Sequence, residues 1–123
     1  MLLGTDIIEI DRIRNSVANA QFLSHVFSES ERSYLASKTD PAPSAAGMFA
    51  AKEAFAKAVG TGFRGFGPAD ISVEHTPAGA PFYRLQGGAK KAAEGWRFTL
   101  SISHCRTFAV ACAAAEKEAD CLG

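Results

Sequence analysis

An alanine-rich segment, FAAKEAFAKAVGTG (Phe49–Gly62), sets the strongest limit on the architecture of this chain. Alanine favours helix more than any other residue, and Gly60 is typical of a helix C-terminus, so the sequence predicts a long helix over residues 45–59. Glu53 is the only carboxylate within that range, and Lys52 and Lys57 stand on either side of it. A surface helix would carry many charges and a core helix none, so Glu53 requires an explanation of its own.

Patterning around the long helix predicts an α+β fold, with helices packed on an antiparallel sheet, in a single domain of residues 1–123. Helical signals dominate before it, and strand signals dominate after it. The expected elements are a strand over residues 2–10, a helix after Asp11, a helix opened by the Ser28–Glu31 capping box and continuing to Ala36, loops over Thr39–Ser44 and Gly60–Pro68, strands over Asp70–Thr76 and Pro81–Leu85, a short helix over 88–94, and a closing strand pair over 96–103 and 107–114.

Composition argues against several classes of function. Thirteen basic side chains balance thirteen acidic ones, so the global charge indicates neither a nucleic-acid partner nor an anionic membrane. No apolar run approaches the roughly 20 residues that cross a bilayer, and the N-terminus lacks the pattern of a signal peptide. The three cysteines, Cys105, Cys112 and Cys121, lack metal-ligand spacing, which indicates reduced thiols in a cytoplasmic protein.

Asp6 is the first of three polar residues expected on an apolar face. Side chains alternate along a strand, so Asp6 shares its face with Leu2, Gly4, Ile8 and Ile10. A buried carboxylate costs several kcal/mol unless it is paired, protonated or bound to a metal. The structural alternative is an aspartate that accepts backbone hydrogen bonds where the strand twists.

Glu53 and Lys57 lie one turn apart on the predicted helix, opposite the core face formed by Met48, Ala51, Phe55 and Val59. They are flanked by Ala50 and Ala56, whose small side chains leave room for a ligand to approach. The structural alternative is a surface Glu–Lys pair, which contributes only about 0.2–0.5 kcal/mol.

His104 ends the apolar row of the strand FTLSISHC, with the same parity as Phe98, Leu100 and Ile102. Such a histidine is often structural or simply exposed at a strand end, but it can also bind a phosphate. Two carboxylates, a lysine, a histidine and a glycine-rich loop together suit a magnesium–phosphate site, because Mg²⁺ takes one or two carboxylates and completes its shell with water and substrate phosphates.

Three motifs in order and spacing give the chain a family resemblance: GTDIIEIDRI near the N-terminus, FAAKEAFAKAVGTG in the middle and SISH near the C-terminus. With these motifs the chain resembles the holo-acyl-carrier-protein synthases, small bacterial phosphopantetheinyl transferases of fatty-acid synthesis. The resemblance covers nearly the whole chain. It implies transfer of 4′-phosphopantetheine from coenzyme A to a serine of apo-acyl carrier protein, with release of adenosine 3′,5′-bisphosphate. It also implies a homotrimer with active sites at subunit interfaces.

The resemblance further implies roles for individual residues. Asp6 and Glu53 fall on the two Mg²⁺ carboxylates, and Glu53 and Lys57 on the catalytic positions. The residues that fall on coenzyme A-binding positions are Lys57, Gly60, Thr61, Gly62 and His104. Arg12 falls on a basic position that meets the acidic carrier protein, with Arg14 as a second candidate that could equally be a solvated charge. The general base stays open between Glu53 and a water on the magnesium ion.

One departure from the family pattern is visible at Met48, where many members carry arginine. It removes one polar contact but no metal ligand. Two other functions therefore remain to be tested: a non-catalytic nucleotide-binding domain, and a magnesium-dependent nucleotide hydrolase.

Overall fold

Residues 1–119 are the part of the chain that the computed structural model describes, and most of them lie in two antiparallel sheets and the helices given below. The larger sheet has the strand order β1-β5-β4, and the smaller one is the β2–β3 hairpin. The strands are β1 (Leu2–Glu9), β2 (Ile71–His75), β3 (Pro81–Leu85), β4 (Trp96–His104) and β5 (Phe108–Lys117). The helices are α1 (Ile10–Ser16), α2 (Ala20–Val26), α3 (Glu29–Ala36), α4 (Ala42–Val59) and α5 (Gly87–Ala92), with a 3₁₀ turn η1 (Pro68–Asp70).

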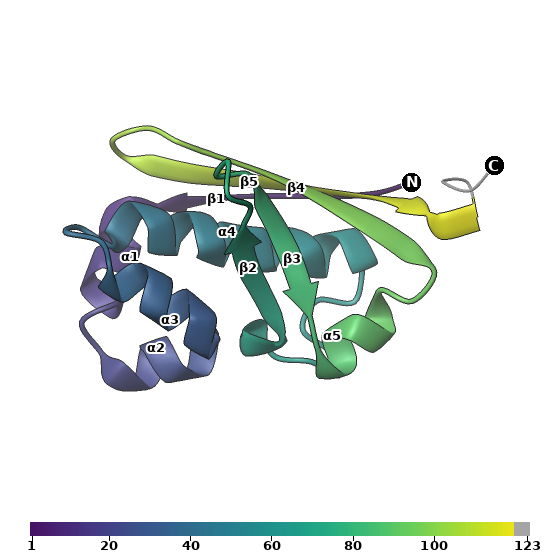
Figure 1. Cartoon of the computed structure of the whole chain (residues 1–123), viewed down its shortest axis with the longest axis horizontal. Helices are drawn as coiled ribbons and strands as arrows, with labels where there is room; N and C mark the ends of the chain where they lie inside the picture. Colours follow the sequence, from purple (N-terminus) through teal and green to yellow (C-terminus); the bar gives the residue numbers. More distant parts are fainter. Residues whose placement is uncertain (120–123) are drawn as a thin grey trace.

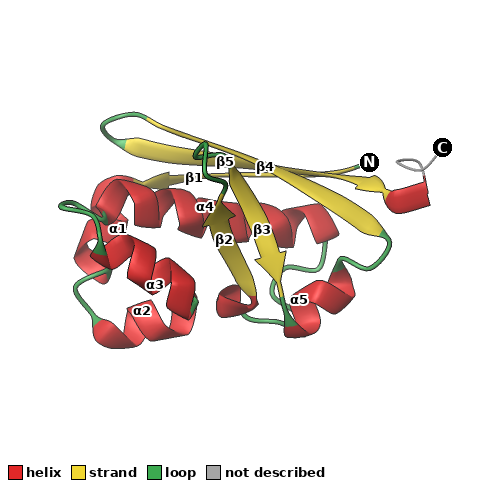
Figure 2. Cartoon of the chain, viewed as in Figure 1, coloured by secondary structure: helices red, strands yellow, loops and turns green. Residues whose placement is uncertain are grey.

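Helix α4 is the centre of the architecture. It runs along one face of the three-stranded sheet, and the β2–β3 hairpin crosses its other side (Figure 1). Helices α1, α2 and α3 gather near one end of α4, and α5 lies toward the other end (Figure 2). The expected α+β fold, with helices on an antiparallel sheet, is confirmed.

Alanine allows α4 to lie very close to the sheet. A Cβ atom added to Gly4 of β1 would come within 2.0 Å of the Ala54 carbonyl oxygen, so only glycine fits there. The inward-facing residues of β5 are also alanines, and Ala109, Ala111 and Ala113 are fully buried. Burial of closely packed apolar surface stabilises this helix–sheet layer.

The same packing corrects the expectation about Ala50 and Ala56. Both are buried, with at most 2% of their surface exposed, so they leave no room for a ligand. The small side chains beside Glu53 instead allow neighbouring segments to pack closely against α4, which is covered on both sides. Met48, Ala51 and Phe55 are buried as expected, and Val59 packs against the core.

Element boundaries differ from expectation at several places. Helix α4 begins at Ala42 and not at residue 45, because prolines are tolerated in a first helical turn and the Asp40 carboxylate accepts a hydrogen bond from the Ala42 amide (3.3 Å). Strand β1 ends at Glu9, and α1 starts at Ile10. Helix α2 was not expected as a separate element; Asn19 caps it by accepting from the amides of Gln21 and Phe22. The Ser28–Glu31 capping box is confirmed.

Two of the three cysteines can be placed. Cys105 and Cys112 are free thiols, whereas Cys121 lies outside the described residues. Within residues 1–119 no helix combines the length and the apolar character needed to cross a membrane.

Candidate active site

The carboxylate of Asp6 and the ammonium group of Lys57 meet although 51 positions separate them in the chain. The Lys57 Nζ atom lies 3.1 Å from Asp6 Oδ1; the Asp6 side chain is 16% exposed and the Lys57 side chain 56%. In the described residues Lys57 makes its salt bridge with Asp6 and not with Glu53, which removes the simple surface-pair interpretation. Within the same residues no backbone amide donates to the Asp6 carboxylate, so the structural alternative for Asp6 is not observed either.

The Glu53 carboxyl feels the charges of both Asp6 and Lys57, and the two charges shift its pKa in opposite directions. Burial raises the pKa of the Glu53 carboxyl, the charge of Asp6 raises it further, and Lys57 and Arg12 oppose the shift. No hydrogen bond or salt bridge to the Glu53 carboxylate occurs within residues 1–119. The site therefore holds two interacting carboxylates, one of which has no partner of its own.

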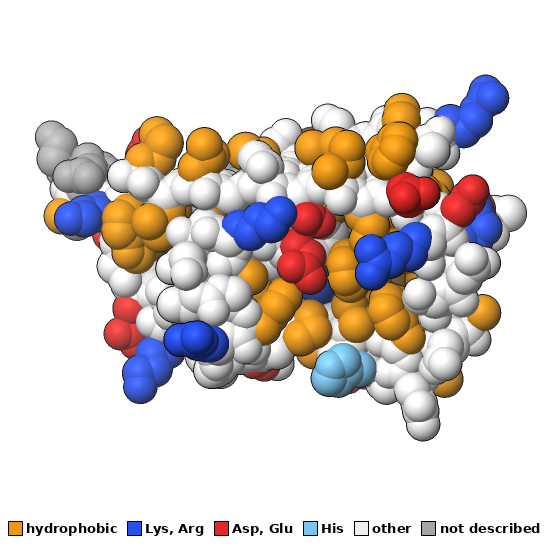
Figure 3. All heavy atoms as spheres, turned by 180° about the vertical axis from the view of Figure 1, so that it is seen from behind, with side chains coloured by type: hydrophobic (Ala, Val, Ile, Leu, Met, Phe, Trp, Pro, Cys, Tyr) orange, Lys and Arg blue, Asp and Glu red, His pale blue; other side chains and the backbone are white. Residues whose placement is uncertain are grey.

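This donor set fits a hard divalent cation. Bringing a cation beside Asp6 and Glu53 would relieve the mutual repulsion that raises the Glu53 pKa. Mg²⁺ needs only one or two protein carboxylates when water and phosphate complete its shell, and the described part of the chain offers no cluster of three or more acidic, histidine or cysteine ligands. Figure 3 shows acidic side chains between basic ones near the middle of the face behind the view of Figure 1.

The glycine-rich loop begins one turn after Lys57. Gly60 adopts a left-handed conformation (φ 83°) and ends α4, and its amide donates to the carbonyl oxygens of Ala56 and Lys57. Gly60, Thr61 and Gly62 are all exposed, and Gly62 also has positive φ (62°). The amides of Thr61 and Gly62, which donate no hydrogen bond within the described residues, are thus available beside a lysine, an arrangement suited to phosphate.

His104 does not join this cluster within one chain. It ends β4, whereas Asp6 lies on β1, and β5 separates the two strands. The exposed ring of His104 instead borders a cavity of about 270 Å³ on the other flank of α4. Its other lining residues include Gly47 and Met48 of α4, Ile102, Pro81 and the stacked rings of Tyr34 and His75, whose centroids are 4.5 Å apart.

The two candidate carrier-binding arginines differ in their surroundings. Arg12 is exposed, makes no salt bridge within the described residues, and lies near enough to lower the pKa of Glu53. Arg14 Nη1 lies 2.6 Å from Asp40 Oδ1, and Arg14 Nε lies 3.3 Å from Asp11 Oδ1. Arg14 thus already joins α1 to the start of α4, and hydrogen bonding to Asp40 raises the pKa of its guanidinium.

Sequence reasoning missed a second charged pair. Lys52, next to Glu53, is buried with Glu31 of α3, and their charged atoms lie 2.7 Å apart. The capping-box pattern drew attention to Glu31, but nothing in that pattern shows that the same carboxylate also binds a lysine 21 positions away.

Known sequences resemble the chain over nearly its full length. A model of the 4′-phosphopantetheinyl transferase superfamily matches residues 2–113. The holo-[acyl-carrier-protein] synthase of Thermoanaerobacter sp. is 44% identical over 94% of this chain and 86% of its own length. The enzyme of the same name from Clostridium acetobutylicum is 43% identical over 93% of this chain and 95% of its own.

Solved structures agree with these matches. The holo-(acyl-carrier-protein) synthase of Bacillus anthracis in complex with CoA (3′,5′-ADP) is 34% identical, with a TM-score of 0.81 over 94% of this chain and 96% of that one. The Neisseria meningitidis holo-[acyl-carrier-protein] synthase is 34% identical, with a TM-score of 0.86 over 95% and 100% of the two chains. On both sequence and fold, this chain belongs to the 4′-phosphopantetheinyl transferase superfamily.

Proposed function

We propose that this chain is a holo-acyl-carrier-protein synthase, which transfers 4′-phosphopantetheine from coenzyme A to a serine of apo-acyl carrier protein. The single observation that carries the proposal is the convergence of Asp6, Glu53 and Lys57 beside the glycine-rich loop. Two relatives of this name, from Thermoanaerobacter sp. and Clostridium acetobutylicum, are 44% and 43% identical to the chain, and the similar structure from Bacillus anthracis is a complex with CoA (3′,5′-ADP).

Asp6 and Glu53 would hold one Mg²⁺ ion. The under-satisfied Glu53 carboxylate and its repulsion from Asp6 support this assignment. When bound, the ion supplies positive charge that stabilises the pyrophosphate of coenzyme A.

Phosphoryl transfer depends on positioning and on charge stabilisation. The serine oxygen of the carrier forms a bond to the β-phosphorus of coenzyme A, and the bond from that phosphorus to the oxygen of adenosine 3′,5′-bisphosphate breaks. Lys57 neutralises negative charge on the phosphates of coenzyme A, and the backbone of Gly60, Thr61 and Gly62 contacts the same ligand beside Lys57. The serine proton goes to a base, for which Glu53 and a water on the magnesium ion are both candidates.

His104 binds a phosphate of the same coenzyme A from another copy of the chain. Two features support self-association with sites between subunits, and the family resemblance implies that the assembly is a homotrimer. His104 and Lys57 sit on opposite flanks of one chain, so a shared ligand requires two chains. The outer face of the three-stranded sheet exposes the apolar residues Leu3, Ile7, Phe108 and Val110. In Figure 3 hydrophobic side chains line the top of the molecule, where this sheet lies.

Arg12, at the start of α1, would receive an acidic surface of the carrier protein. Its lack of a salt bridge in the described residues and its nearness to Glu53 support that role. Arg14, held by Asp40, is the weaker candidate.

One assay distinguishes the possible functions. The protein is incubated with coenzyme A, Mg²⁺ and apo-acyl carrier protein, and the carrier is followed by mass spectrometry. A synthase adds phosphopantetheine to the carrier. Hydrolysis of coenzyme A without transfer would indicate the nucleotide hydrolase, and binding without turnover would indicate a non-catalytic domain.

A further inference from the structure

Lys52 is a buried charge that the proposed reaction does not use. It follows Ala51 in α4 and precedes Glu53, yet its side chain is 1% exposed and that of its partner Glu31 is not exposed at all. Removing two charges from water is costly, and a pair of apolar residues would often serve stability as well. We therefore expect the Lys52–Glu31 pair to have a role besides stabilising the core.

All three ammonium protons of Lys52 have an acceptor. Nζ lies 2.7 Å from Glu31 Oε1, 3.0 Å from the Pro68 carbonyl oxygen and 2.5 Å from the Ile71 carbonyl oxygen. An ammonium group has three donors, so its hydrogen-bonding capacity is complete. Two of the three bonds go to the backbone of η1 and of the first residue of β2.

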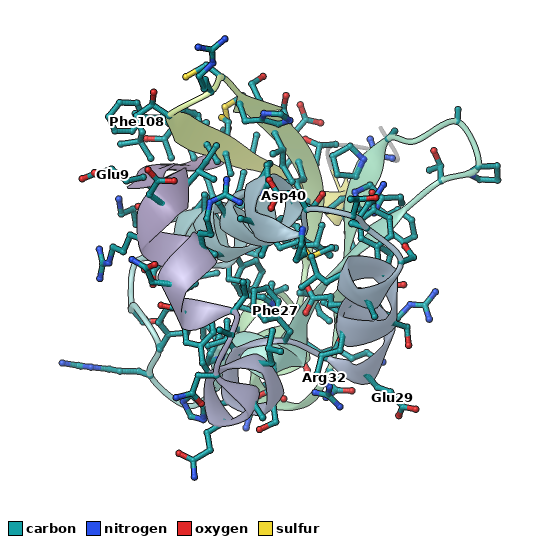
Figure 4. The ribbon with its side chains drawn as sticks, turned by 90° about the vertical axis from the view of Figure 1, so that its left-hand side faces the viewer. Glu9, Phe27, Glu29, Arg32, Asp40 and Phe108 are labelled. Carbon is teal, nitrogen blue, oxygen red and sulfur yellow. The ribbon has the colours of Figure 1, made fainter. Side chains whose placement is uncertain are left out.

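The Glu31 carboxylate is equally occupied. Oε1 also accepts from the Ser28 amide (2.9 Å), and Oε2 accepts from the Val73 amide (2.8 Å). Phe27 lies in the interior beside the pair, with its ring 5.5 Å from the Lys52 Nζ atom (Figure 4). Lys52 and Glu31 thus join α3, α4, η1 and β2.

These bonds meet the chain where the glycine-rich loop ends. The loop leaves α4 at Gly60 and reaches η1 at Pro68, and its last residue, Gly67, donates its amide to Asp70 Oδ2 (3.2 Å). Helix α4 thus holds the start of the loop directly and the end of the loop through Lys52. An apolar contact supports the same end, because the Phe66 ring packs edge-on against Phe55 at 5.7 Å.

We propose that Lys52 is a positioning residue for the glycine-rich loop: it fixes the end of the loop relative to Glu53 and Lys57 on the same helix, so that the loop binds coenzyme A in place. This inference rests on the proposed function. The physical reason is entropic, since a loop rich in glycine loses much conformational freedom when it binds a ligand, and a second anchor reduces that loss in advance.

The test uses the full chain and avoids an unpaired buried charge. The double variant Lys52→Met/Glu31→Gln removes both charges together and deletes the bonds to Pro68 and Ile71. The matched control is Ile13→Ala, a buried substitution in α1 that leaves η1 and the loop untouched. A second double variant, Lys52→Leu/Glu31→Gln, also leaves no unpaired buried charge and is used if the first does not fold.

Two measurements report on the loop. Amide hydrogen exchange at Gly67 and Asp70 follows the anchor itself, and we expect exchange at least about tenfold faster in the double variant than in the control. Isothermal titration with coenzyme A follows the consequence, and we expect a Kd at least about tenfold weaker, with the control near wild type.

The results separate anchoring from general stability. Exchange and coenzyme A affinity that match those of the Ile13→Ala control would overturn the proposal, and so would faster exchange with unchanged affinity. Wild-type protein that failed to bind coenzyme A would contradict the proposed function instead, and the exchange rates would still decide whether Lys52 anchors the loop.

Discussion

Lys52 and Glu53 are neighbours in α4, but their charges have opposite environments. Lys52 is buried and has an acceptor for each ammonium proton, one of them the Glu31 carboxylate. Glu53 is partly exposed, and no hydrogen bond reaches its carboxylate within residues 1–119. One position completes its interactions inside the fold, and the next leaves them open.

The difference separates a charge that is satisfied within the fold from one that is available to a ligand, as we propose for Glu53. Burial lowers the pKa of Lys52, and the neighbouring charge of Glu31 opposes part of that shift. Burial and Asp6 both raise the pKa of Glu53, and a bound cation would reverse that effect. Perturbed carboxyls that lack a partner are typical of binding and catalytic sites.

The largest effect on stability is expected for Glu31→Ala. This change leaves the Lys52 ammonium buried without a counter-charge, which typically costs about 3–5 kcal/mol. Urea unfolding measures the free energy of unfolding, with Asp6→Ala as the control from the other charged cluster. If Glu31→Ala lowered the free energy of unfolding as little as Asp6→Ala does, the Lys52–Glu31 pair would contribute no more to stability than the Asp6–Lys57 pair, and the comparison would be wrong.

The largest effect on activity is expected for Asp6→Ala and Glu53→Gln. Each removes one of the two proposed Mg²⁺ ligands, and we expect loss of transfer by about a hundredfold or more with the fold intact. Initial rates are measured by mass spectrometry over a range of Mg²⁺ concentrations. Near-normal activity of Asp6→Ala at limiting Mg²⁺ would contradict the shared metal site.

Lys57→Ala should act on coenzyme A and not on the carrier. Loss of a cation that contacts phosphates is expected to lower kcat/KM for coenzyme A by about tenfold, with little change in the KM for the carrier. Steady-state kinetics with each substrate varied in turn makes the comparison. A change confined to the carrier KM would reassign Lys57 to the docking surface.

Arg12→Glu should weaken carrier binding at low salt by several-fold, and less at high salt, because exposed charges are screened over about 8 Å at physiological ionic strength. Titration of the carrier at two salt concentrations measures the effect, and coenzyme A affinity should stay unchanged. Arg14→Glu is the matched variant, since Arg14 is already paired with Asp40. Equal carrier affinity of wild type and Arg12→Glu at low salt would leave Arg12 with a role in stability alone.

The smallest effect concerns pH. Because the pKa of Glu53 is raised in the folded state, the folded protein binds the carboxyl proton of Glu53 more tightly than the unfolded chain does. The free energy of unfolding of the wild type therefore decreases as the pH rises from the unfolded-state pKa of Glu53 through its folded-state pKa. Glu53→Gln removes this dependence and should be slightly more stable than wild type at neutral pH, by about 0.5 kcal/mol or less. Thermal unfolding at pH 4 to 8 tests it. Added Mg²⁺ should stabilise wild type and leave the variant unchanged; equal stabilisation of both would argue against Glu53 as a ligand.

Local chemistry allowed much of the fold and part of the site to be predicted from the sequence. Strand parity placed Asp6 on the inward face of β1, and helical spacing placed Glu53 and Lys57 together on α4, because these periodicities follow from backbone geometry. The Ser28–Glu31 capping box and the glycine that ends α4 were predicted because both depend on residues close together in the sequence.

Contacts between distant segments were decided only by the tertiary structure. The Glu31–Lys52 pair, the Arg14–Asp40 bridge and the burial of Ala50 and Ala56 each depend on which surfaces meet, and no local pattern encodes that. The physical reason is that the free energy of a charge or a small side chain depends on its surroundings, which belong to the whole fold. Residue type and spacing thus determined where the carboxylates of this protein could lie, and packing decided which charges were enclosed and which stayed open to a ligand.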